Sequence, residues 1–568
     1  MHIQHHNPCS VALNKLIQQG INPIMAKIYA IRGIKQLDEL NTNLSNLPHP
    51  YTLLGAKEAG EILYNAIKNN SDITIVADYD CDGATSCAVA IRGLNLLAQK
   101  KLNINFIVPN RFIHGYGLTP EIVDLVIEQN PQTKILITVD NGISSFEGVE
   151  YAKAKGLIVI ITDHHLSSKE LPKADVIVNP NQPNCGFISK NIAGVGVIFY
   201  VLMAARIILR ENNYYKNTQE PKLNTLLDLV ALGTVADVVK LDSLNRCFVH
   251  NGLQRIKNSQ LQVGLLNIAQ VAGKNYQDMQ SLDLGFAIAP RVNAAGRIDD
   301  MSIGITCLIS DDFNKTQNIA QTLNTLNSQR KSIESSIKEQ VNIQLENFDA
   351  DKFTICLFGK EWHQGVIGIV ASRFKDKYHL PTLIFAQDED ENFIKGSGRS
   401  ISGFHMRDAI DAISKKSPHI ITKFGGHSMA AGLSIHKKYF EEFCADFEEY
   451  AQQNICINDL KKQIFVDAEL DIKEHCIELA ELVQTQVWGQ GFQSPLFGNY
   501  FQILDQKILK DQHLKLKVKL ENKTFDAIWF FHNEYITQYA YIVYELNINI
   551  WQNQKNLQLM IKYIKISN

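Results

Sequence analysis

The chain has 568 residues, of which 45% are apolar and 20% are charged, and its formal net charge is -3. This composition is ordinary for a globular protein with sizeable cores. At about 150 residues per domain, the length predicts three or four domains. With this net charge, the protein as a whole does not attract nucleic acid electrostatically. A nucleic-acid partner would therefore have to bind local basic surfaces.

The ten cysteines run from Cys9 to Cys476 without a CxxC pair or zinc-finger spacing. Because no secretory leader precedes them, we expect reduced thiols and a cytoplasmic protein. The most membrane-like segment, which begins at Ala193, is interrupted by Arg206. We therefore expect a buried core helix there and no membrane partner.

Residues 1–65 look helical and mixed, and they form a lead-in without evident chemistry. Between residues 66 and 309, short apolar strands alternate with helical patterns. The strand sequences are "DITIVAD", "INFIVPN", "KILITVDNG", "LIVIITDHH" and "ADVIVNP". Continuous apolar strands that alternate with helices predict an α/β domain with a parallel sheet covered on both faces.

Three further segments follow this domain. Residues 310–348 have apolar positions at helical spacing and no Gly or Pro, which predicts one long connecting helix capped by Ser310 or Asp311. Residues 349–455 contain the strand-like runs "FTICLF" and "TLIFA" and predict a second α/β unit. Residues 460–568 are rich in β-branched and aromatic residues, which predicts a small β-barrel or sandwich.

Acidic side chains follow the strands of the first sheet, at the edge where open α/β sheets build their ligand sites. An aspartate at the end of a helical pattern can reach the same edge. The residues concerned are Asp78, Asp80, Asp82, Asp140, Asp163, His164, His165 and Asp237. A single aspartate after a strand is often only a helix cap or turn residue, but convergence of several on one edge favours a metal site.

Carboxylates with an imidazole suit Mn²⁺ or Mg²⁺. Because there are more anionic groups than one ion needs, we expect two ions that share carboxylates, as in phosphoester-cleaving centres. Adjacent histidines rarely face the same ion. One of His164 and His165 is therefore expected to be a ligand, and the other an outer or phosphate contact.

Ordered motifs resemble a known family. "DYDCDG", "VPNR", "ITVDNG", "ITDHH" and "ALGTVADVV" are similar to motifs of the DHH phosphoesterase superfamily. Within it, "PRVNAAGRIDD", "WHQGVIGIVASRF", "GSGRS", "FHMRD" and "GGHSMAAGL" resemble the bacterial RecJ single-stranded-DNA exonucleases. The resemblance implies a DHH catalytic domain, a DHH-associated substrate-binding domain and a C-terminal OB-fold barrel.

The resemblance also implies processive removal of mononucleotides from a 5′ end of single-stranded DNA with Mn²⁺ or Mg²⁺. It implies work in DNA repair and recombination beside single-stranded-DNA-binding protein and a RecQ-type helicase. We expect a monomer. By motif position, it marks His165 as catalytic and implies metal ligands at Asp78, Asp80, Asp82, Asp140, His164 and Asp237.

Several polar residues are candidates for contacts to DNA. Arg111 follows a strand and can grip a phosphate, or else it forms an ion pair with the aspartates. The "PRVNAAGR" segment suits DNA-backbone contacts or, equally, a domain-interface network. Its candidate residues are Arg291, Asn293 and Arg297.

The second α/β unit adds three candidates. Arg399 lies on a glycine-flanked segment, His427 follows a double glycine, and His363 precedes a predicted helix. A buried ring bonded to the backbone is the alternative for both histidines. The motif resemblance favours a substrate contact for His427.

In the tail, "HLKLKVKL" places Lys515, Lys517 and Lys519 on one face of a strand, near the aromatic run 529–531. This pattern predicts a barrel that binds single strands, although lysines also protect edge strands. The family resemblance favours the barrel.

Two other functions are open. One is a DHH phosphodiesterase for short oligonucleotides or cyclic dinucleotides, or a pyrophosphatase; the other is a non-catalytic scaffold of the same fold. The long helix, "PRVNAAGR" and the β-rich tail favour a polymeric substrate. The complete set of acidic positions favours catalysis.

Overall fold

The computed structural model describes residues 2–110, 113–346, 348–349, 351–551 and 554–566. The chain forms two compact units. One consists of Met1–Gln4 and Thr325–Ile464, and the other of His5–Asn324 and Phe465–Asn568.

A five-stranded parallel sheet organises one part of the larger unit, with the order β3-β2-β4-β5-β6. All neighbouring strands pair in parallel. Every residue of β2 and β4 is buried, because helices cover both faces. The predicted parallel sheet is thus confirmed. Its strands are β2 (Ile73–Ala77), β3 (Ile104–Ile107), β4 (Ile135–Val139), β5 (Ile158–Thr162) and β6 (Val176–Val178).

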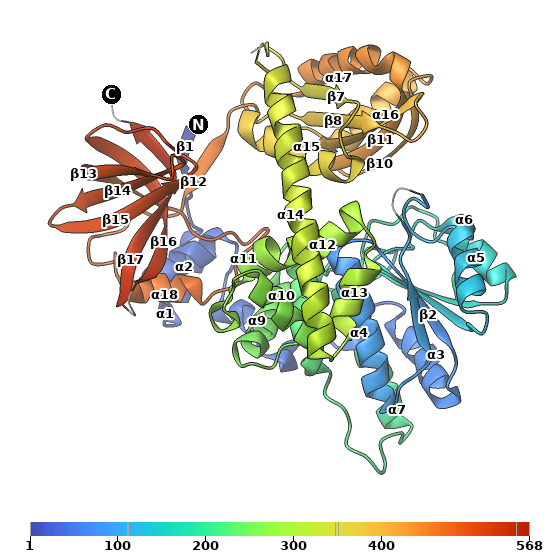
Figure 1. Ribbon diagram of the computed structural model, residues 1–568. Helices are drawn as coiled ribbons and strands as arrows, with labels where there is room; N and C mark the ends of the chain where they lie inside the picture. The colour runs from blue at the N-terminus through green and yellow to red at the C-terminus, as the bar shows by residue number, and fades with distance from the viewer. Residues whose placement is uncertain (1, 111–112, 347, 350, 552–553, 567–568) are drawn as a thin grey trace. The chain divides into compact units, whose positions relative to one another are not determined.

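Figure 1 shows helices on either side of this sheet. α5 (Pro120–Gln129) and α6 (Phe146–Ala154) share an apolar core with β2, β4 and β5. The other face is packed by α4 (Cys81–Ala98) and α7 (Gly194–Glu211), with α3 (Ala56–Asn69) beside β6. α7 is the segment expected to be a buried core helix, and most of its side chains are buried. Among the described helices, none has the length and apolar character needed to cross a lipid bilayer.

Further helices extend this part of the unit. α8 (Leu227–Ala236) packs against α4, α7 and α9, and its first eight residues are buried. The helices that follow it are α9 (Ser243–Lys257), α10 (Val263–Val271), α11 (Ser281–Asp283), α12 (Ala289–Ile298) and α13 (Ser302–Ile309). The N-terminal elements are β1 (His2–His5), α1 (Ser10–Gln18) and α2 (Pro23–Ile31).

The predicted long helix is α14 (Phe313–Gln344). Its predicted cap was wrong: the Asp312 carboxylate accepts the Lys315 N–H at 3.0 Å, not Ser310 or Asp311. Arg92 explains the difference, because its guanidinium donates to the Asp311 carboxylate at 2.7 Å. A tertiary ion pair therefore removes the local candidate.

The second α/β unit contains a mixed sheet with the order β10-β11-β9-β8-β7. Only β7 and β8 are parallel, and β8–β9, β9–β11 and β11–β10 are antiparallel. Side chains such as Phe385, Phe443 and Phe447 form its core. The strands are β7 (Ile355–Gly359), β8 (Thr382–Gln387), β9 (Phe393–Arg399), β10 (Ile421–Gly426) and β11 (Ala430–His436). The helices are α15 (Gln364–Tyr378), α16 (Met406–Lys416) and α17 (Phe440–Asn454).

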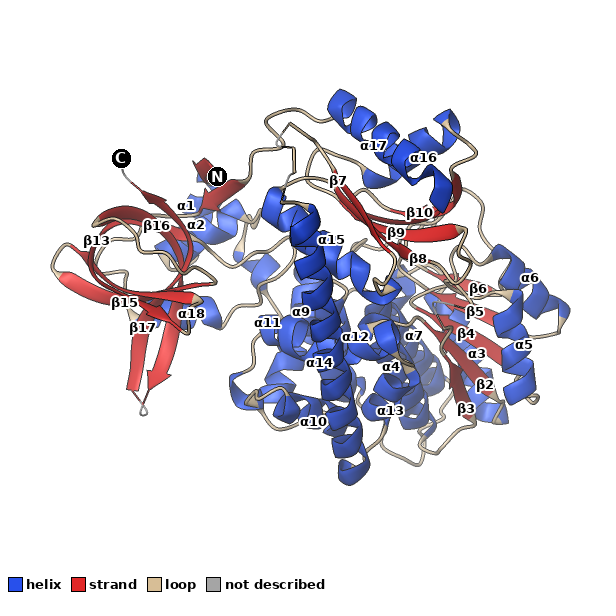
Figure 2. Cartoon of the chain, turned by 45° about the horizontal axis from the view of Figure 1, so that its top comes forward, coloured by secondary structure: helices blue, strands red, loops and turns tan. Residues whose placement is uncertain are grey.

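The C-terminal strands close into a barrel in the order β13-β14-β15-β17-β16 (Figure 2). The parallel β15–β17 pair closes it, and the other pairs are antiparallel. A barrel, rather than a sandwich, is therefore the architecture of the tail. Its strands are β13 (Phe497–Leu509), β14 (His513–Leu520), β15 (Lys523–Phe530), β16 (Tyr539–Trp551) and β17 (Gln554–Ile566). β12 (Gln463–Val466) pairs with β1, and α18 (Ile477–Gln484) packs on β16 and β17.

Candidate metal centre

A tight turn between β2 and α4 presents three aspartates together. Asp78 follows the strand, and Asp80 caps the helix by accepting the N–H groups of Asp82 and Gly83 at 2.8 and 3.0 Å. A Cβ on Gly83 would lie 2.4 Å from the Asp78 carbonyl oxygen. Only glycine therefore lets the helix begin this close to the strand end.

Asp82 is held by the N-terminus of α7. Its two carboxylate oxygens accept the N–H groups of Gly194 at 2.7 Å and Val195 at 3.0 Å. The free amides of a first helical turn are natural partners of an anion. The Asp82 side chain is buried. These two hydrogen bonds fix the orientation of its carboxylate.

Asp140 follows β4 with a left-handed backbone, φ 62°. A non-glycine residue rarely adopts this conformation, and aspartate tolerates it better than most. The neighbouring Asn141 side chain donates to the carbonyl oxygens of Val76 at 3.1 Å and Val139 at 2.9 Å. These bonds join the ends of β2 and β4 and bring Asp140 beside the first aspartates.

Asp163 orients the two histidines. One of its carboxylate oxygens accepts the N–H groups of His164 and His165 and contacts the His165 Nδ1 at 2.7 Å. The other accepts the Ile143 N–H at 2.9 Å. Because both oxygens are engaged, Asp163 positions the histidine loop. Burial lowers the basicity of His165, but the bond to Asp163 outweighs it and raises the pKa of His165 to about 9.

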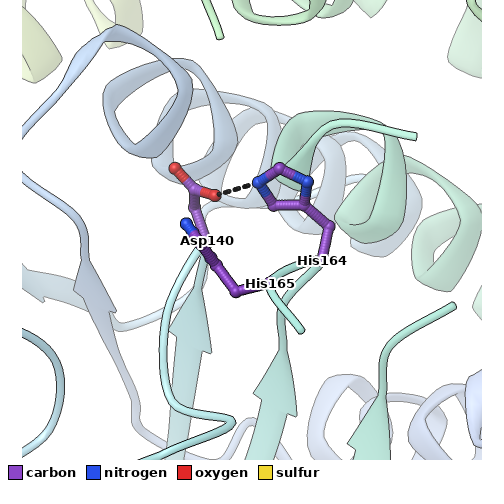
Figure 3. A group of neighbouring side chains, drawn as sticks. All are labelled: Asp140, His164 and His165. Atoms are coloured by element: carbon purple, nitrogen blue, oxygen red, sulfur yellow. Dashed lines mark ion pairs between the residues drawn. The ribbon is translucent and has the colours of Figure 1, made fainter. Parts of the chain in front are cut away.

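Three buried atoms that could each bind a cation have no hydrogen-bond partner among the described residues: Asp140 Oδ1, His164 Nε2 and Asp237 Oδ2. They nevertheless face one another. The His164 Nε2 lies 3.2 Å from Asp140 Oδ1 and 3.4 Å from Asp237 Oδ2, and Figure 3 shows the first pair. Buried polar groups are normally satisfied, so atoms that converge without hydrogen-bond geometry fit a shared cation.

Ligand atoms within 4.8 Å of one another form three groups around this point. Asp140 belongs to two of the groups, as a carboxylate shared by two ions would. The structure thus brings together all six residues expected to hold metal. The groups are Asp78, Asp80 and Asp140; Asp82, His164 and Asp237; and Asp140, His164 and His165.

The electrostatics of the cluster also fit cations. Burial and repulsion from neighbouring aspartates raise the pKa values of Asp82 and Asp237 to about 8. The same two causes raise the pKa values of Asp78 and Asp140 well above their usual range. Burial lowers the pKa of His164. A neutral imidazole among carboxylates is the form that binds a metal.

Stabilisation by Mn²⁺ is expected to increase with pH. Asp82 and Asp237 each have a pKa of 3.8 in the unfolded chain and about 8 in the folded chain. Between pH 3.8 and about pH 8, these groups therefore bind more protons in the metal-free folded chain than in the unfolded chain. The stability of the metal-free folded chain therefore falls as the pH rises through this window. Because Mn²⁺ replaces the protons, we expect the Mn²⁺-induced rise in Tm to be about 3 °C or more larger at about pH 8.5 than at about pH 6.5. Thermal melts with and without Mn²⁺ measure this, and equal rises at both pH values would contradict it.

Two of the predicted DNA contacts of the larger unit, Arg291 and Asn293, have internal partners. Arg111 lies outside the described residues. The Arg291 guanidinium donates to the Asn324 side chain at 3.0 Å and to the Ala287 carbonyl at 2.6 Å. Asn293 accepts the Cys81 N–H at 2.8 Å, so it positions the aspartate turn. Arg297 lies in the last turn of α12.

In the second α/β unit, the three candidates lie at the two opposite strand ends of the sheet, here called its edges. His363 caps α15, as expected, by accepting the Gly365 N–H at 3.0 Å, and it follows β7. Arg399 ends β9 opposite Thr382, and His427 follows β10 at that same edge. The length of β8, roughly 17 Å, separates the two edges. His363 and His427 therefore follow opposite ends of the strands in this sheet.

On the barrel, the three lysines of β14 lie among acids and aromatic side chains. Lys517 faces Asp505 and Asp526 across the ladder, and the Lys515 Nζ lies 3.7 Å from Asp526. Lys519 and Tyr539 face Gln502 from its two sides. Tyr539 is 55% exposed and the neighbouring Tyr500 is 65% exposed. The outer face thus combines positive charge with exposed rings.

Sequence analysis missed the residues that hold the histidine loop. Asn179 donates to the His165 carbonyl at 2.9 Å, and Asn181 donates to the His164 carbonyl at 2.6 Å. Both follow β6, whose apolar sequence was recognised as a strand. The strand-end rule applied to the aspartates would have found them. No pattern in the sequence indicated that the Gly194 N–H would hold the Asp82 carboxylate.

Three family models match the chain. They are the DHH family N-terminal domain over residues 72–234, the DHHA1 domain over residues 350–453 and the RecJ OB domain over residues 466–563. A solved structure of Thermus thermophilus RecJ in complex with Mn²⁺ matches with a TM-score of 0.83 and 25% identity, over 100% of this chain and 79% of that chain. A structure of exonuclease RecJ bound to manganese matches with a TM-score of 0.60 and 30% identity, over 73% of this chain and 100% of that chain.

Whole-length relatives carry the same description, single-stranded-DNA-specific exonuclease RecJ. The Haemophilus influenzae protein is 42% identical over 558 residues, which is 96% of each chain. The Escherichia coli protein is 40% identical over 559 residues, 95% of this chain and 96% of the relative. With such coverage and identity, the chain belongs to the RecJ family of single-stranded-DNA-specific exonucleases.

Proposed function

We propose that this protein is a single-stranded-DNA-specific exonuclease that hydrolyses phosphodiester bonds with two divalent ions, Mn²⁺ or Mg²⁺. The observation that carries the proposal is the convergence of Asp140 Oδ1, His164 Nε2 and Asp237 Oδ2, all buried and without hydrogen-bond partners in the described part of the chain. The whole-length similarity to RecJ proteins supports the substrate class. The manganese in the Thermus thermophilus relative supports the ion.

The chemistry divides between the ions and the protein. When bound, the ions supply a hydroxide nucleophile and stabilise charge on the phosphoryl group. The protein holds them through carboxylates that α7, Asn141 and Asn293 keep in place. His165, whose pKa is about 9, stays protonated at neutral pH. It offers positive charge to a phosphate oxygen, while Asp163 fixes its orientation. The residues proposed to hold the ions are Asp78, Asp80, Asp82, Asp140, His164 and Asp237.

The polarity of degradation is part of the proposal. Cleavage from the 5′ end with release of 5′-mononucleotides is what the resemblance to the family implies. In the second unit, Arg399 and His427 are proposed as phosphate contacts because they share one sheet edge. His363 is proposed as a separate contact. Arg111, Arg291 and Arg297 are proposed to meet the strand near the metal centre.

The barrel is proposed to bind the rest of the strand. Exposed tyrosines beside lysines on one outer face suit bases that stack and phosphates that pair with cations. Single strands released from duplex ends fit work in DNA repair and recombination. A single-stranded-DNA-binding protein and a RecQ-type helicase are proposed partners, and the protein is proposed to act as a monomer. Ten free cysteines support the cytoplasm as its compartment.

Replacing Lys515, Lys517 and Lys519 together with alanine is expected to weaken binding to long single strands. If all three contact phosphates, the slope of log Kd against log salt should change by about 2. Because Asp505 and Asp526 already oppose two of the lysines, a change nearer 1 is expected. Fluorescence titrations across a salt series measure it. The charge-matched control replaces three exposed lysines elsewhere, Lys68, Lys173 and Lys216. A slope equal to that of the control would show that these three barrel lysines do not contact the DNA.

One assay tests the proposed function. A long single strand labelled at the 5′ or the 3′ end is incubated with the full chain and Mn²⁺, with duplex and dinucleotide as competitors. We expect immediate release of a labelled mononucleotide from the 5′-labelled strand only, with little competition from either competitor. Preferred cleavage of the dinucleotide would favour a short-oligonucleotide phosphodiesterase. No cleavage of any substrate would favour a scaffold.

A further inference from the structure

A cavity of about 710 Å³ lies away from the metal centre in the larger unit, between the C-terminal half of α4, the start of α8 and the end of α9. Both α4 and α8 carry candidate metal ligands at their opposite ends: Asp80 caps α4, and Asp237 ends α8. The nearest lining residues are Leu229 on α8 and Ile91 on α4, which place the cavity about 12–17 Å from those ligands along the helix axes. It is therefore a separate feature.

The floor of this cavity holds a buried carboxylate with a free acceptor. Asp228 is 1% exposed, and its Oδ2 accepts the Gln262 N–H at 2.6 Å. Its Oδ1 has no hydrogen-bond partner among the described residues. Leaving a buried acceptor unpaired costs free energy. The atom is thus suited to receive a donor from outside the protein.

A donor without a partner lines the same cavity. The Arg255 Nε is buried and has no hydrogen-bond partner among the described groups, whereas its two terminal nitrogens donate to Gln260. Arg255 and Asp228 are close enough for the guanidinium to favour the charged carboxylate. The lining of this cavity therefore includes one acceptor and one donor that have no hydrogen-bond partner among the described residues.

The rim of the cavity is positively charged. Lys100 and Lys101 are exposed, line the cavity and form no ion pair with any described residue. Arg92 also lines it, but its charge is matched by Asp311 at 2.7 Å. Two uncompensated lysines therefore stand above the Asp228–Arg255 floor, which favours an anionic group at the mouth.

We propose that this cavity binds a nucleoside 5′-phosphate, with the base edge on Asp228 and Arg255 and the phosphate on Lys100 and Lys101. An inorganic anion would satisfy the lysines but would meet the Asp228 carboxylate with another acceptor. A simple amine would satisfy Asp228 but not the rim. A nucleobase edge presents a donor beside an acceptor and is joined to a phosphate. The volume lies within the range of small-ligand sites, about 300–1,000 Å³.

The test is calorimetric titration of the full chain, in Mg²⁺, with the four 2′-deoxynucleoside 5′-monophosphates and with inorganic phosphate. We expect at least one nucleotide to bind about tenfold more tightly than phosphate. Lys100→Ala/Lys101→Ala should weaken that nucleotide about tenfold, because it loses two charge-assisted contacts. Lys173→Ala/Lys216→Ala, which removes two exposed lysines elsewhere, should leave it unchanged.

The Asp228→Asn variant tests whether the Asp228 carboxylate contacts the nucleobase. The amide oxygen can still accept the Gln262 N–H, but an NH₂ group replaces the free acceptor. The advantage of the nucleotide over phosphate should fall to about twofold or less. If this variant does not fold, the titration of Lys100→Ala/Lys101→Ala alone tests the proposal. No nucleotide binding, equally tight phosphate, or binding that survives loss of both lysines would each overturn the proposal. The last result would place the nucleotide at the metal centre.

Discussion

Asp140→Ala is expected to lower the rate of single-strand hydrolysis by about 10⁴-fold, equivalent to roughly 5 kcal/mol of transition-state stabilisation. Asp140 belongs to two of the three ligand groups, so its loss would affect both proposed ions. The measurement is single-turnover cleavage of a labelled strand at saturating Mn²⁺. Activity within a few-fold of the unaltered chain would contradict the role of this aspartate.

Stability separates loss of chemistry from loss of fold in this variant. Burial, followed by repulsion from Asp82, Asp80 and Asp78, raises the pKa of Asp140, and removing this carboxylate relieves that repulsion. Against this gain, alanine at φ 62° costs about 1–2 kcal/mol. Asp140→Asn is the matched control, because asparagine tolerates the left-handed backbone. Both variants should lose the Mn²⁺-induced rise in Tm, and only Asp140→Ala should show a lower Tm without metal.

Much of the fold follows from local pattern because its strands are buried on both faces. β2 and β4 read as unbroken apolar runs, and the carboxyl ends of parallel strands meet at one edge. That rule alone brings Asp78, Asp140 and His164 together. The antiparallel half of the second sheet was less visible, since β9 contains two glycines and resembles a loop. Sequence analysis therefore did not show that His363 and His427 lie at opposite edges.

Contacts between distant segments limited the rest. Ser310 or Asp311 was expected to cap α14, but Asp311 binds Arg92, which lies 219 residues earlier. Asn293 was expected to contact DNA or to join a domain-interface network, and the structure shows that it accepts the N–H of Cys81, 212 residues away. Neither partner is encoded by spacing or periodicity. Residue type thus predicted which groups are polar and functional, whereas their partners required the folded chain.

Gly194→Ala is expected to reduce kcat/KM by about 10²-fold through displacement of a metal ligand, although glycine carries no chemistry of its own. A Cβ at this position would lie 2.5 Å from Asp140 Oδ1 and 2.7 Å from Asp140 Cβ. Contacts this short force either Asp140 or the start of α7 to move. The Gly194 N–H also holds the Asp82 carboxylate, so both ligands would be displaced together.

Two further glycines distinguish displacement from general overpacking. A Cβ on Gly186 meets nothing within 4 Å, so Gly186→Ala should be neutral. A Cβ on Gly93 would lie 2.3 Å from the Leu202 side chain, so Gly93→Ala should cost about 1–3 kcal/mol of stability without touching a ligand. Activity and Mn²⁺ affinity are measured well below the Tm of each variant. If Gly194→Ala loses no more of either than Gly93→Ala, the approach of α7 to Asp140 only supports the fold. A loss confined to Gly194→Ala instead places the start of this helix in control of the metal geometry.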